Sequence, residues 1–130
     1  MISYGFLWSH EADARRHDPI KDRPTVVVLA VGEGDNPTVL VAPITSRDPA
    51  RPEAIALRPS AVAGLDRGGW IIPWEVNAFR WPGPDVRPAI HPSGAWWRIG
   101  ALNPPLRRRL REAIQAALND RRTRITQRRE

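Results

Sequence analysis

The sequence predicts a mainly β protein in which a small, curled, mostly antiparallel sheet is followed by one C-terminal α-helix. Three observations predict this class. First, a β-branched run, a turn-forming segment and a second apolar run follow one another over residues 25–42 and indicate a β-hairpin. Second, several other short apolar segments are separated by polar loops that contain Pro and Gly. Third, only one stretch, near the C-terminus, has apolar residues at helical spacing.

The chain begins with two segments of different character. Residues 2–8 are apolar and predict a first strand, whereas residues 9–22 form a charged, irregular connection of fourteen residues. A loop of this length is unusual in a small domain, and such loops are often mobile or functional. This one leads directly to Arg23.

The β-hairpin is the clearest local prediction. Residues 25–31 form its first strand, residues 32–37 supply Gly, Asp, Asn and Pro for the turn, and residues 38–42 form its second strand. A hairpin brings its outer ends back together. Arg23 and Thr45, each just outside its strand, should therefore lie close in space.

The middle of the chain alternates short apolar segments with breaks. Polar and Pro-containing residues mark the loops, and Gly64 is expected to end a helical turn. The expected segments are a loop over 46–53, a strand over 54–57, a helical turn over 59–63, and strands over 70–72 and 75–79.

The last third of the chain predicts a loop, a helix and a tail. Residues 81–94 are rich in Pro and Gly, which excludes a helix or a central strand. Asn103 is an expected N-cap before two prolines at the first helical positions. Residues 119–130 have no apolar pattern and predict a solvated basic tail. The helical stripe, expected to pack on the sheet or on a second chain, is Leu106, Leu110, Ile114, Ala117 and Leu118.

Composition indicates one basic domain. A chain of 130 residues with 42% hydrophobic residues can build one modest core, which we assign to residues 1–118. The net charge of +6 and a pI near 11.3 make nucleic acid or another polyanion the default partner. Nineteen of the twenty basic residues are Arg, which fits either a preference for phosphate or the base composition of a genome.

Several classes of chemistry are not expected. The absence of Cys excludes disulfides, a thiolate nucleophile and a Cys-based zinc site, and it fits a reducing cytoplasm. No segment approaches the roughly 20 apolar residues of a membrane span, and residues 2–8 are too short for a secretory signal core. The three His residues lack the spacing of metal ligands. We therefore expect a cytoplasmic protein with no metal, no cofactor and no membrane contact.

The two ends of the predicted hairpin combine a cation with hydroxyl groups. Arg23 offers planar bidentate donors suited to phosphate oxygens, and Thr45 and Ser46 add small donors, so an anion site is expected at this strand end. Two ordinary roles stay open. Arg23 could be a surface residue paired with Asp22 or Asp18, and the hydroxyls could cap the local backbone.

Three strings of the sequence resemble a known family. KDRPTVVVLA at residues 21–30, VLVAPITS at 39–46 and WEVNAFRWPG at 74–83 resemble the PemK-type and MazF-type toxins of bacterial toxin–antitoxin modules, and the resemblance covers roughly residues 2–118. It implies an SH3-like barrel with a C-terminal helix. It also implies a homodimer whose groove binds single-stranded RNA, cleavage of that RNA through its own 2′-hydroxyl without a metal, and a cognate antitoxin that blocks the groove.

The resemblance also implies roles for individual residues. Arg23 belongs to the Arg-Pro motif, whose Arg is catalytic in the family, and it would stabilise the negative charge of the phosphorane together with Thr45 and Ser46. The general base would be Asp18, which matches a position that is acidic in some members, or Glu75, which lies in the WEVN segment. Both carboxylates could instead be ordinary salt-bridge or loop residues.

Contacts with RNA should come from basic, amide and aromatic side chains near these motifs. Asn77 could read a base edge, and Arg80 beside Trp81 could stack on a base and bind phosphate. His17 has the pKa best suited to proton transfer, although it too could be a loop residue. Each Trp could instead fill the core or a dimer interface. The expected RNA contacts are His17, Lys21, Arg47, Asn77, Arg80 and Trp81.

Two other functions remain open from the sequence. A non-enzymatic module on the same scaffold, as in the gyrase-inhibiting toxins, would hold a protein partner and would not need Arg23 or Thr45. A degenerate relative would bind RNA or an antitoxin without cutting. Salt-dependent RNA binding without cleavage would identify the second case.

Overall fold

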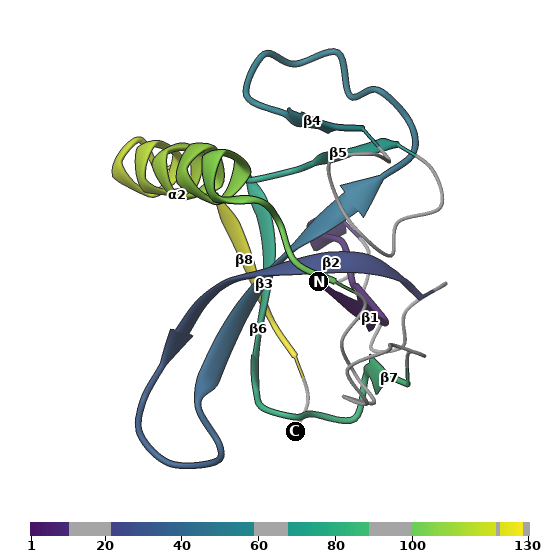
Figure 1. Ribbon diagram of the computed structural model, residues 1–130. Coiled ribbons are helices and arrows are strands. Elements are labelled where there is room, and N and C mark those ends of the chain that lie inside the picture. The colour runs from purple at the N-terminus through teal and green to yellow at the C-terminus, as the bar shows by residue number, and fades with distance from the viewer. Residues whose placement is uncertain (11–21, 59–67, 89–99, 122, 129–130) are drawn as a thin grey trace.

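The protein is mainly β, with an eight-stranded, mostly antiparallel and barrel-like sheet and one C-terminal helix (Figure 1). The computed structural model describes residues 1–10, 22–58, 68–88, 100–121 and 123–128. The fold class predicted from the sequence is therefore confirmed. The elements in order are β1 (Ile2–Tyr4), β2 (Arg23–Val31), β3 (Thr38–Thr45), β4 (Ile55–Leu57), β5 (Gly69–Ile71), β6 (Glu75–Arg80), β7 (Val86–Arg87), α2 (Pro104–Asn119) and β8 (Arg124–Gln127).

The predicted hairpin is confirmed as the antiparallel pair β2 and β3. Its register runs from Thr25 opposite Pro43 to Val31 opposite Thr38, with an irregularity between Val27 and Leu29. Both strands are longer than the apolar runs, because Arg23 is the first residue of β2 and Thr45 is the last residue of β3. The expectation that these two residues lie just outside their strands is therefore wrong. Arg23 extends β2 by pairing with β1, and Thr45 extends β3 by pairing with β5.

Strand β3 lies at the centre of the fold, and its neighbours change along its length. One side pairs with β2, while the other side pairs first with β6 and then with β5. Since one strand bonds to three others, the sheet curls rather than remaining flat. In Figure 1, β5 lies beside the C-terminal end of β3 and β6 lies beside its N-terminal half.

The N-terminal strand is shorter than predicted. β1 ends at Tyr4, because the Phe6 amide donates to the Tyr4 carbonyl at 2.9 Å and turns the chain. The amide of Gly5, which lies between Tyr4 and Phe6, donates to the Asp85 carbonyl at 2.9 Å. β1 pairs with β2 on one side and with β7 on the other, so the Pro-rich segment contributes a two-residue edge strand.

The remaining short strands lie where the sequence predicts them. β4, β5 and β6 correspond to the three expected segments, with shifts of one residue at their ends. The helical turn expected over 59–63 lies outside the described residues.

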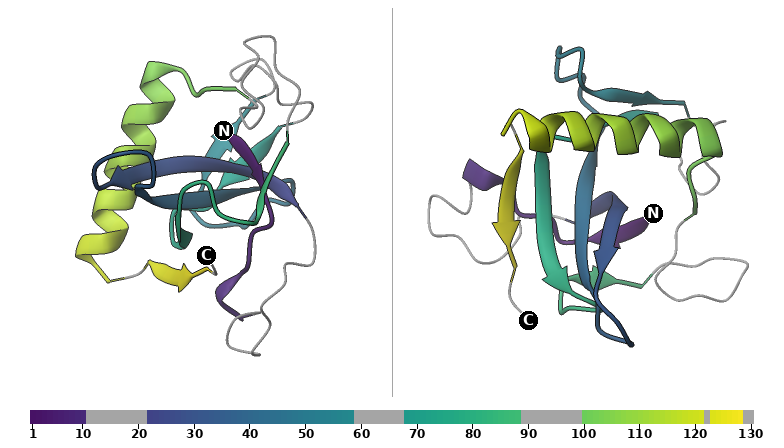
Figure 2. Two further views of the ribbon diagram at one scale, coloured as in Figure 1. Left: turned by 90° about the horizontal axis from the view of Figure 1, so that it is seen from below. Right: turned by 90° about the vertical axis from the view of Figure 1, so that its left-hand side faces the viewer.

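Helix α2 begins as its sequence predicts and lies across one face of the sheet (Figure 2). The Asn103 side chain accepts a hydrogen bond of 3.0 Å from the Leu106 amide, which satisfies one unpaired N–H of the first turn. Of the predicted stripe, Leu106, Leu110 and Ala117 are buried against the sheet, while Leu118 is 39% exposed.

The prediction of a solvated tail after residue 118 is wrong for residues 124–128. β8 pairs in parallel with β6, and the residues Thr126 and Arg128 are each only 8% exposed. Figure 2 shows this strand completing the edge of the sheet beside β6. A parallel ladder is held by backbone hydrogen bonds, so β8 forms without the apolar pattern that marks an internal strand.

Two clusters of buried side chains form the core. The larger lies between α2 and the sheet, and the smaller lies where β1, β3, β6 and β7 face one another. Among the described residues, no helix is long and apolar enough to cross a membrane. The smaller cluster consists of Ile2, Tyr4, Phe6, Val39, Val41, Phe79 and Val86.

Candidate functional site at the mouth of the hairpin

The outer end of the β2–β3 hairpin carries Arg23 on one strand and Thr45 on the other. The last paired residues are Thr25 and Pro43, and Arg23 and Thr45 each lie two residues further out on their own strands. Residues opposite one another in an antiparallel pair point to the same face, and the side-chain period is two. Continuing this register by two residues assigns both side chains to the same face of the hairpin. We call this place, with Ser46 and Arg47, the hairpin mouth.

The two strands diverge at the mouth because each acquires a new partner. Arg23 pairs with Tyr4 of β1, and Thr45 pairs with Trp70 of β5. Both side chains are half-buried, so they are held in place and remain in contact with solvent. A fork between strands, with a guanidinium on one branch and a hydroxyl on the other, can receive an anionic group between them.

Trp8 holds the guanidinium of Arg23. The Arg23 Cζ atom lies 5.0 Å from the centre of the Trp8 ring, within the range of a cation–π interaction. The Trp8 indole has no oxygen acceptor, so it does not take N–H donors of Arg23 as a carboxylate would. Trp8 can therefore orient Arg23 without competing with a phosphate.

Trp8 belongs to a row of rings that the sequence analysis missed. Phe6 meets it edge-on at 5.3 Å, and His10 lies nearly parallel to it at 6.5 Å. We assigned Trp8 only to the first strand, because it is distant from Arg23 in sequence. The pairing of β1 with the start of β2 is what joins them, and the local sequence pattern contains no signal for that pairing.

The Thr45 hydroxyl has a local hydrogen bond and still has a proton to donate. Its Oγ1 accepts from the Arg47 amide at 3.3 Å, which is the ordinary capping role of a strand-end hydroxyl. A hydroxyl that accepts one bond keeps its own O–H. Ser46 and Arg47 follow directly and are exposed. The capping role and an anion-binding role are therefore compatible.

Glu75, a candidate base, is engaged by Ser9. Its Oε1 accepts from the Ser9 hydroxyl at 2.5 Å and its Oε2 from the Ser9 amide at 3.2 Å, and the residue is 8% exposed. Since both oxygens are occupied, this placement favours a structural role. Glu75 fixes Ser9, the residue next to Trp8, and Trp8 in turn contacts Arg23 of the mouth.

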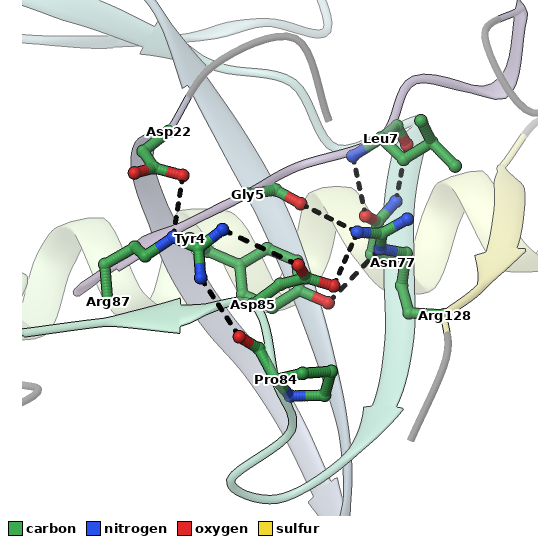
Figure 3. A network of polar contacts seen from close by, with 9 residues as sticks. All are labelled: Tyr4, Gly5, Leu7, Asp22, Asn77, Pro84, Asp85, Arg87 and Arg128. Carbon is green, nitrogen blue, oxygen red and sulfur yellow. Dashed lines mark hydrogen bonds and ion pairs between the residues drawn. The ribbon is translucent and has the colours of Figure 1, made fainter. Parts of the chain in front are cut away.

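Asn77 has a different position from the one that we expected. It is fully buried, and its side-chain amide accepts from the Leu7 amide at 2.9 Å and donates to the Leu7 carbonyl at 2.8 Å. A base edge cannot reach a side chain with no exposed surface. The interpretation of Asn77 as a base reader is therefore corrected to a structural one, in which it ties β6 to the segment after β1 (Figure 3).

Arg80 and Trp81 lie at the opposite end of the hairpin from the mouth. Arg80 pairs with Thr38, and the Trp81 amide donates to the carbonyl of Pro37 in the turn at 2.9 Å. Thr38 and Thr45 lie seven positions apart along β3, about 23 Å at about 3.3 Å per residue. The structure does not bring this pair together with Arg23.

The other expected site residues have varied outcomes. Asp18, His17 and Lys21 lie outside the described residues. Asp22, which we considered a partner of Arg23, forms its ion pair with Arg87 instead, at 3.0 Å. Among the residues described, no group of three or more His, Asp or Glu side chains is placed to hold a metal ion.

Two of the described cavities lie elsewhere. One of about 330 Å³ opens between α2 and the loop before β4, where Arg51 stacks on Trp74 at 3.7 Å. Another, of about 420 Å³, lies between α2 and β2. Neither of these two cavities is lined by Arg23 or Thr45.

Comparison with known proteins agrees with the resemblance noted in the sequence. The family model described as "PemK-like, MazF-like toxin of type II toxin-antitoxin system" matches residues 5–80, more than half of the chain and a range that includes the whole mouth. Searches of curated proteins and of solved structures gave no significant match. The chain therefore belongs to the PemK-like and MazF-like toxin family of type II toxin–antitoxin systems.

Proposed function

We propose that this toxin-family protein is a metal-independent, sequence-selective endoribonuclease that cuts single-stranded RNA at the hairpin mouth. The observation that supports it most is the position of Arg23 and Thr45 at the outer end of the hairpin, where β2 and β3 each pair with another strand. The family match covers both residues. Other observations that fit are the charge of +6 and the absence of a Cys nucleophile.

The proposed reaction uses the RNA's 2′-hydroxyl as the nucleophile. Its oxygen forms a bond to phosphorus, its proton passes to a general base, and the bond from phosphorus to the 5′-oxygen breaks as that oxygen gains a proton. The products are a 2′,3′-cyclic phosphate and a 5′-hydroxyl. The phosphorane that forms at phosphorus carries extra negative charge, which fixed donors stabilise more strongly than water does.

The residues of the mouth would divide this work. Arg23 would donate in-plane N–H groups to the phosphate oxygens, with Thr45 and Ser46 adding hydroxyl donors. Guanidinium does not lose its proton readily, so its main role would be charge stabilisation. Asp18 is our first choice as the general base, since the Glu75 carboxylate is occupied by Ser9.

Substrate contacts would start at Trp8 and Arg47, which flank the fork. His17 and Lys21 stay predicted contacts. We further propose a cytoplasmic protein that acts as a homodimer, without cofactor, and that is blocked by an acidic or amphipathic segment of a cognate antitoxin.

The test is cleavage of a long single-stranded RNA by purified protein in excess EDTA. Arg23→Ala and Thr45→Ala should each abolish cutting while the far-UV circular dichroism spectrum is kept. Arg108→Ala, which removes an exposed Arg from α2, is the matched control and should cut normally. Products of the wild type should end in a 2′,3′-cyclic phosphate.

A binding module on the same scaffold is the competing function. Folded wild-type protein that cuts none of several unrelated RNAs would favour it. Salt-dependent RNA binding without cutting would then indicate a non-cleaving relative, and no RNA binding would indicate a protein target.

A further inference from the structure

Asp22 directly precedes Arg23, and its side chain is tied to a strand that is not its neighbour. Arg87 Nε donates to Asp22 Oδ1 at 3.0 Å (Figure 3). Arg87 belongs to β7, and the order of strands is β2, β1, β7. The ion pair therefore passes over β1 and joins the start of β2 to the edge of the sheet.

The Arg87 guanidinium is held at its other end. Its Nη1 donates to the Pro84 carbonyl at 3.0 Å, and its Nη2 lies 3.7 Å from Asp85 Oδ1. Asp85 is fully buried, so its carboxylate cannot turn away into solvent. Figure 3 shows Arg87 between Asp22 on one side and Pro84 and Asp85 on the other.

The buried carboxylate is in turn fixed from the C-terminal strand. Arg128 Nη2 donates to Asp85 Oδ2 at 2.7 Å and to the Gly5 carbonyl at 3.1 Å, and its side chain is 2% exposed. Arg128 directly follows β8, so its backbone is anchored by the ladder to β6. A buried anchor therefore presets the position from which Arg87 reaches Asp22.

The ion pair between Asp22 and Arg87 is partly exposed, at 47% and 36% of the two side chains. Such pairs contribute little to global stability, because solvent screens them and ordering two side chains costs entropy. Here the anchor has already ordered Arg87, so less freedom is lost when the bond forms. The effect of the bond is therefore local, at the first residue of β2.

We propose that Asp22 and Arg87 are positioning residues, a clamp that fixes the start of β2 and with it the guanidinium of Arg23. The proposal rests on the function proposed above for the mouth. Transition-state donors act only when correctly placed, and a displacement of about 1 Å can lower a rate by up to about a hundredfold. The clamp thus affects turnover rather than folding.

The test is a double-mutant cycle on RNA cleavage with Asp22→Asn, Arg87→Gln and the double variant. All three lack the same bond, so each should lower kcat by about tenfold, and the double variant should lose the same factor rather than a hundredfold. KM should change less than twofold. Asp22→Asn is the cleaner variant because it leaves the buried anchor intact, and its thermal midpoint should stay within a few degrees of the wild type.

Two further variants separate the clamp from simpler effects. Arg87→Lys keeps a donor within reach of Asp22 and should recover part of the lost kcat. Arg108→Gln removes the same charge from an exposed position of α2 and should leave kcat unchanged.

If the wild type cleaves RNA, three results would overturn the clamp and leave the proposed function standing. These are an unchanged kcat in Asp22→Asn, additive losses of kcat in the double variant, or a change in KM without a change in kcat. If the loss of kcat followed the fall in thermal midpoint across all variants, the bond between Asp22 and Arg87 would have only a structural role. A wild type that cleaves no RNA overturns the proposed function itself and the clamp with it.

Discussion

Single residues at the mouth have conformations that their neighbours impose. Trp8 lies over Arg23, Ser9 engages both oxygens of Glu75, and Thr45 is bonded to Arg47. Each contact fixes the position of one side chain at the mouth. Substitutions here should change activity more than stability.

Replacing Trp8 tests the stacking on Arg23. Trp8→Leu should lower RNA cleavage by about 2- to 30-fold, which corresponds to the 0.5 to 2 kcal/mol of a cation–π contact. Trp8→Phe retains an aromatic face and should lose less. Steady-state kinetics of the two variants measure the difference, and equal losses in both would mean that ring volume, rather than the π-face, is what Arg23 requires.

Gly69 allows β5 to approach β3 at Thr45. A Cβ at this position would lie 2.7 Å from the Thr45 carbonyl oxygen and 3.0 Å from Ile44 Cγ2, so Gly69→Ala must displace the end of β3. We expect a loss of about 1–3 kcal/mol in the free energy of unfolding and a loss of cleavage, because Thr45 moves.

The matched control for this change is Gly34→Ala in the hairpin turn. Gly34 has a φ of +81° and nothing within 4 Å of an added Cβ, so Ala there introduces backbone strain far from Thr45. Stability should fall without a loss of activity per folded molecule. Urea unfolding measures the stability of both variants, and cleavage rates measure their activity. An equal loss of activity in Gly69→Ala and Gly34→Ala would disprove the role of Gly69.

At the scale of elements, β8 is the least expected part of the sheet. It adds a parallel strand to β6, and the residue that follows it, Arg128, donates to the buried Asp85 at 2.7 Å. The same Arg lies over the ring of Tyr4, with its Cζ 5.9 Å from the ring centre. The end of the described chain is therefore joined to β1 and to the residue before β7, and β1 in turn pairs with Arg23 of the mouth.

Removing Arg128 should destabilise the whole fold. In Arg128→Met the Asp85 carboxylate loses its 2.7 Å partner and retains Arg87 at 3.7 Å, so we expect a loss of about 3–5 kcal/mol in the free energy of unfolding. Asp85→Asn in the same chain removes the buried charge and should recover part of the lost stability. Urea denaturation measures both, and a single variant as stable as the wild type would show that the pair is dispensable.

At the scale of the whole molecule, the proposed function makes charge and topology the two features that would govern RNA binding. The chain carries +6, and Arg23 lies at a fork between strands. Attraction between a basic protein and RNA is non-specific at long range, whereas the proposed site at the fork would select which phosphate is held. Affinity and cleavage should therefore respond differently to salt.

Binding of an uncleavable 2′-O-methyl RNA should weaken linearly on a logarithmic scale of salt concentration. For a single strand the slope is about −0.7 for each phosphate neutralised, so Arg23→Ala should make the slope less negative by about 0.7. Fluorescence anisotropy at several salt concentrations measures it. A slope that is identical in the variant and the wild type would place Arg23 away from the RNA backbone.

Sequence reasoning predicted the elements whose causes are local. The hairpin follows from a β-branched run and a turn within about twenty residues, and the start of α2 follows from Asn103 and two prolines. The placement of Arg23 and Thr45 at the outer end of the same hairpin also follows from this local pattern. Their joint role in one site stays a prediction.

Contacts between distant segments were not predictable in this way. Asn77 looked available because nothing near it in sequence reveals that Leu7, 70 residues away, uses its amide. Arg128 looked solvated because its carboxylate partner lies 43 residues earlier, in a Pro-rich segment. Trp8 looked like part of a strand, although it lies over Arg23.

The sequence by itself determined that this chain is a mainly β, basic protein with a cation and a hydroxyl at the open end of a hairpin. Propensity, turn chemistry and helix capping act within a few residues and can be recognised in the order of the amino acids. Only the tertiary structure decided which ring holds Arg23, which carboxylates are buried and where the chain's end is anchored. Those outcomes depend on strand pairing and burial between segments far apart in the chain, and no local pattern encodes such pairings.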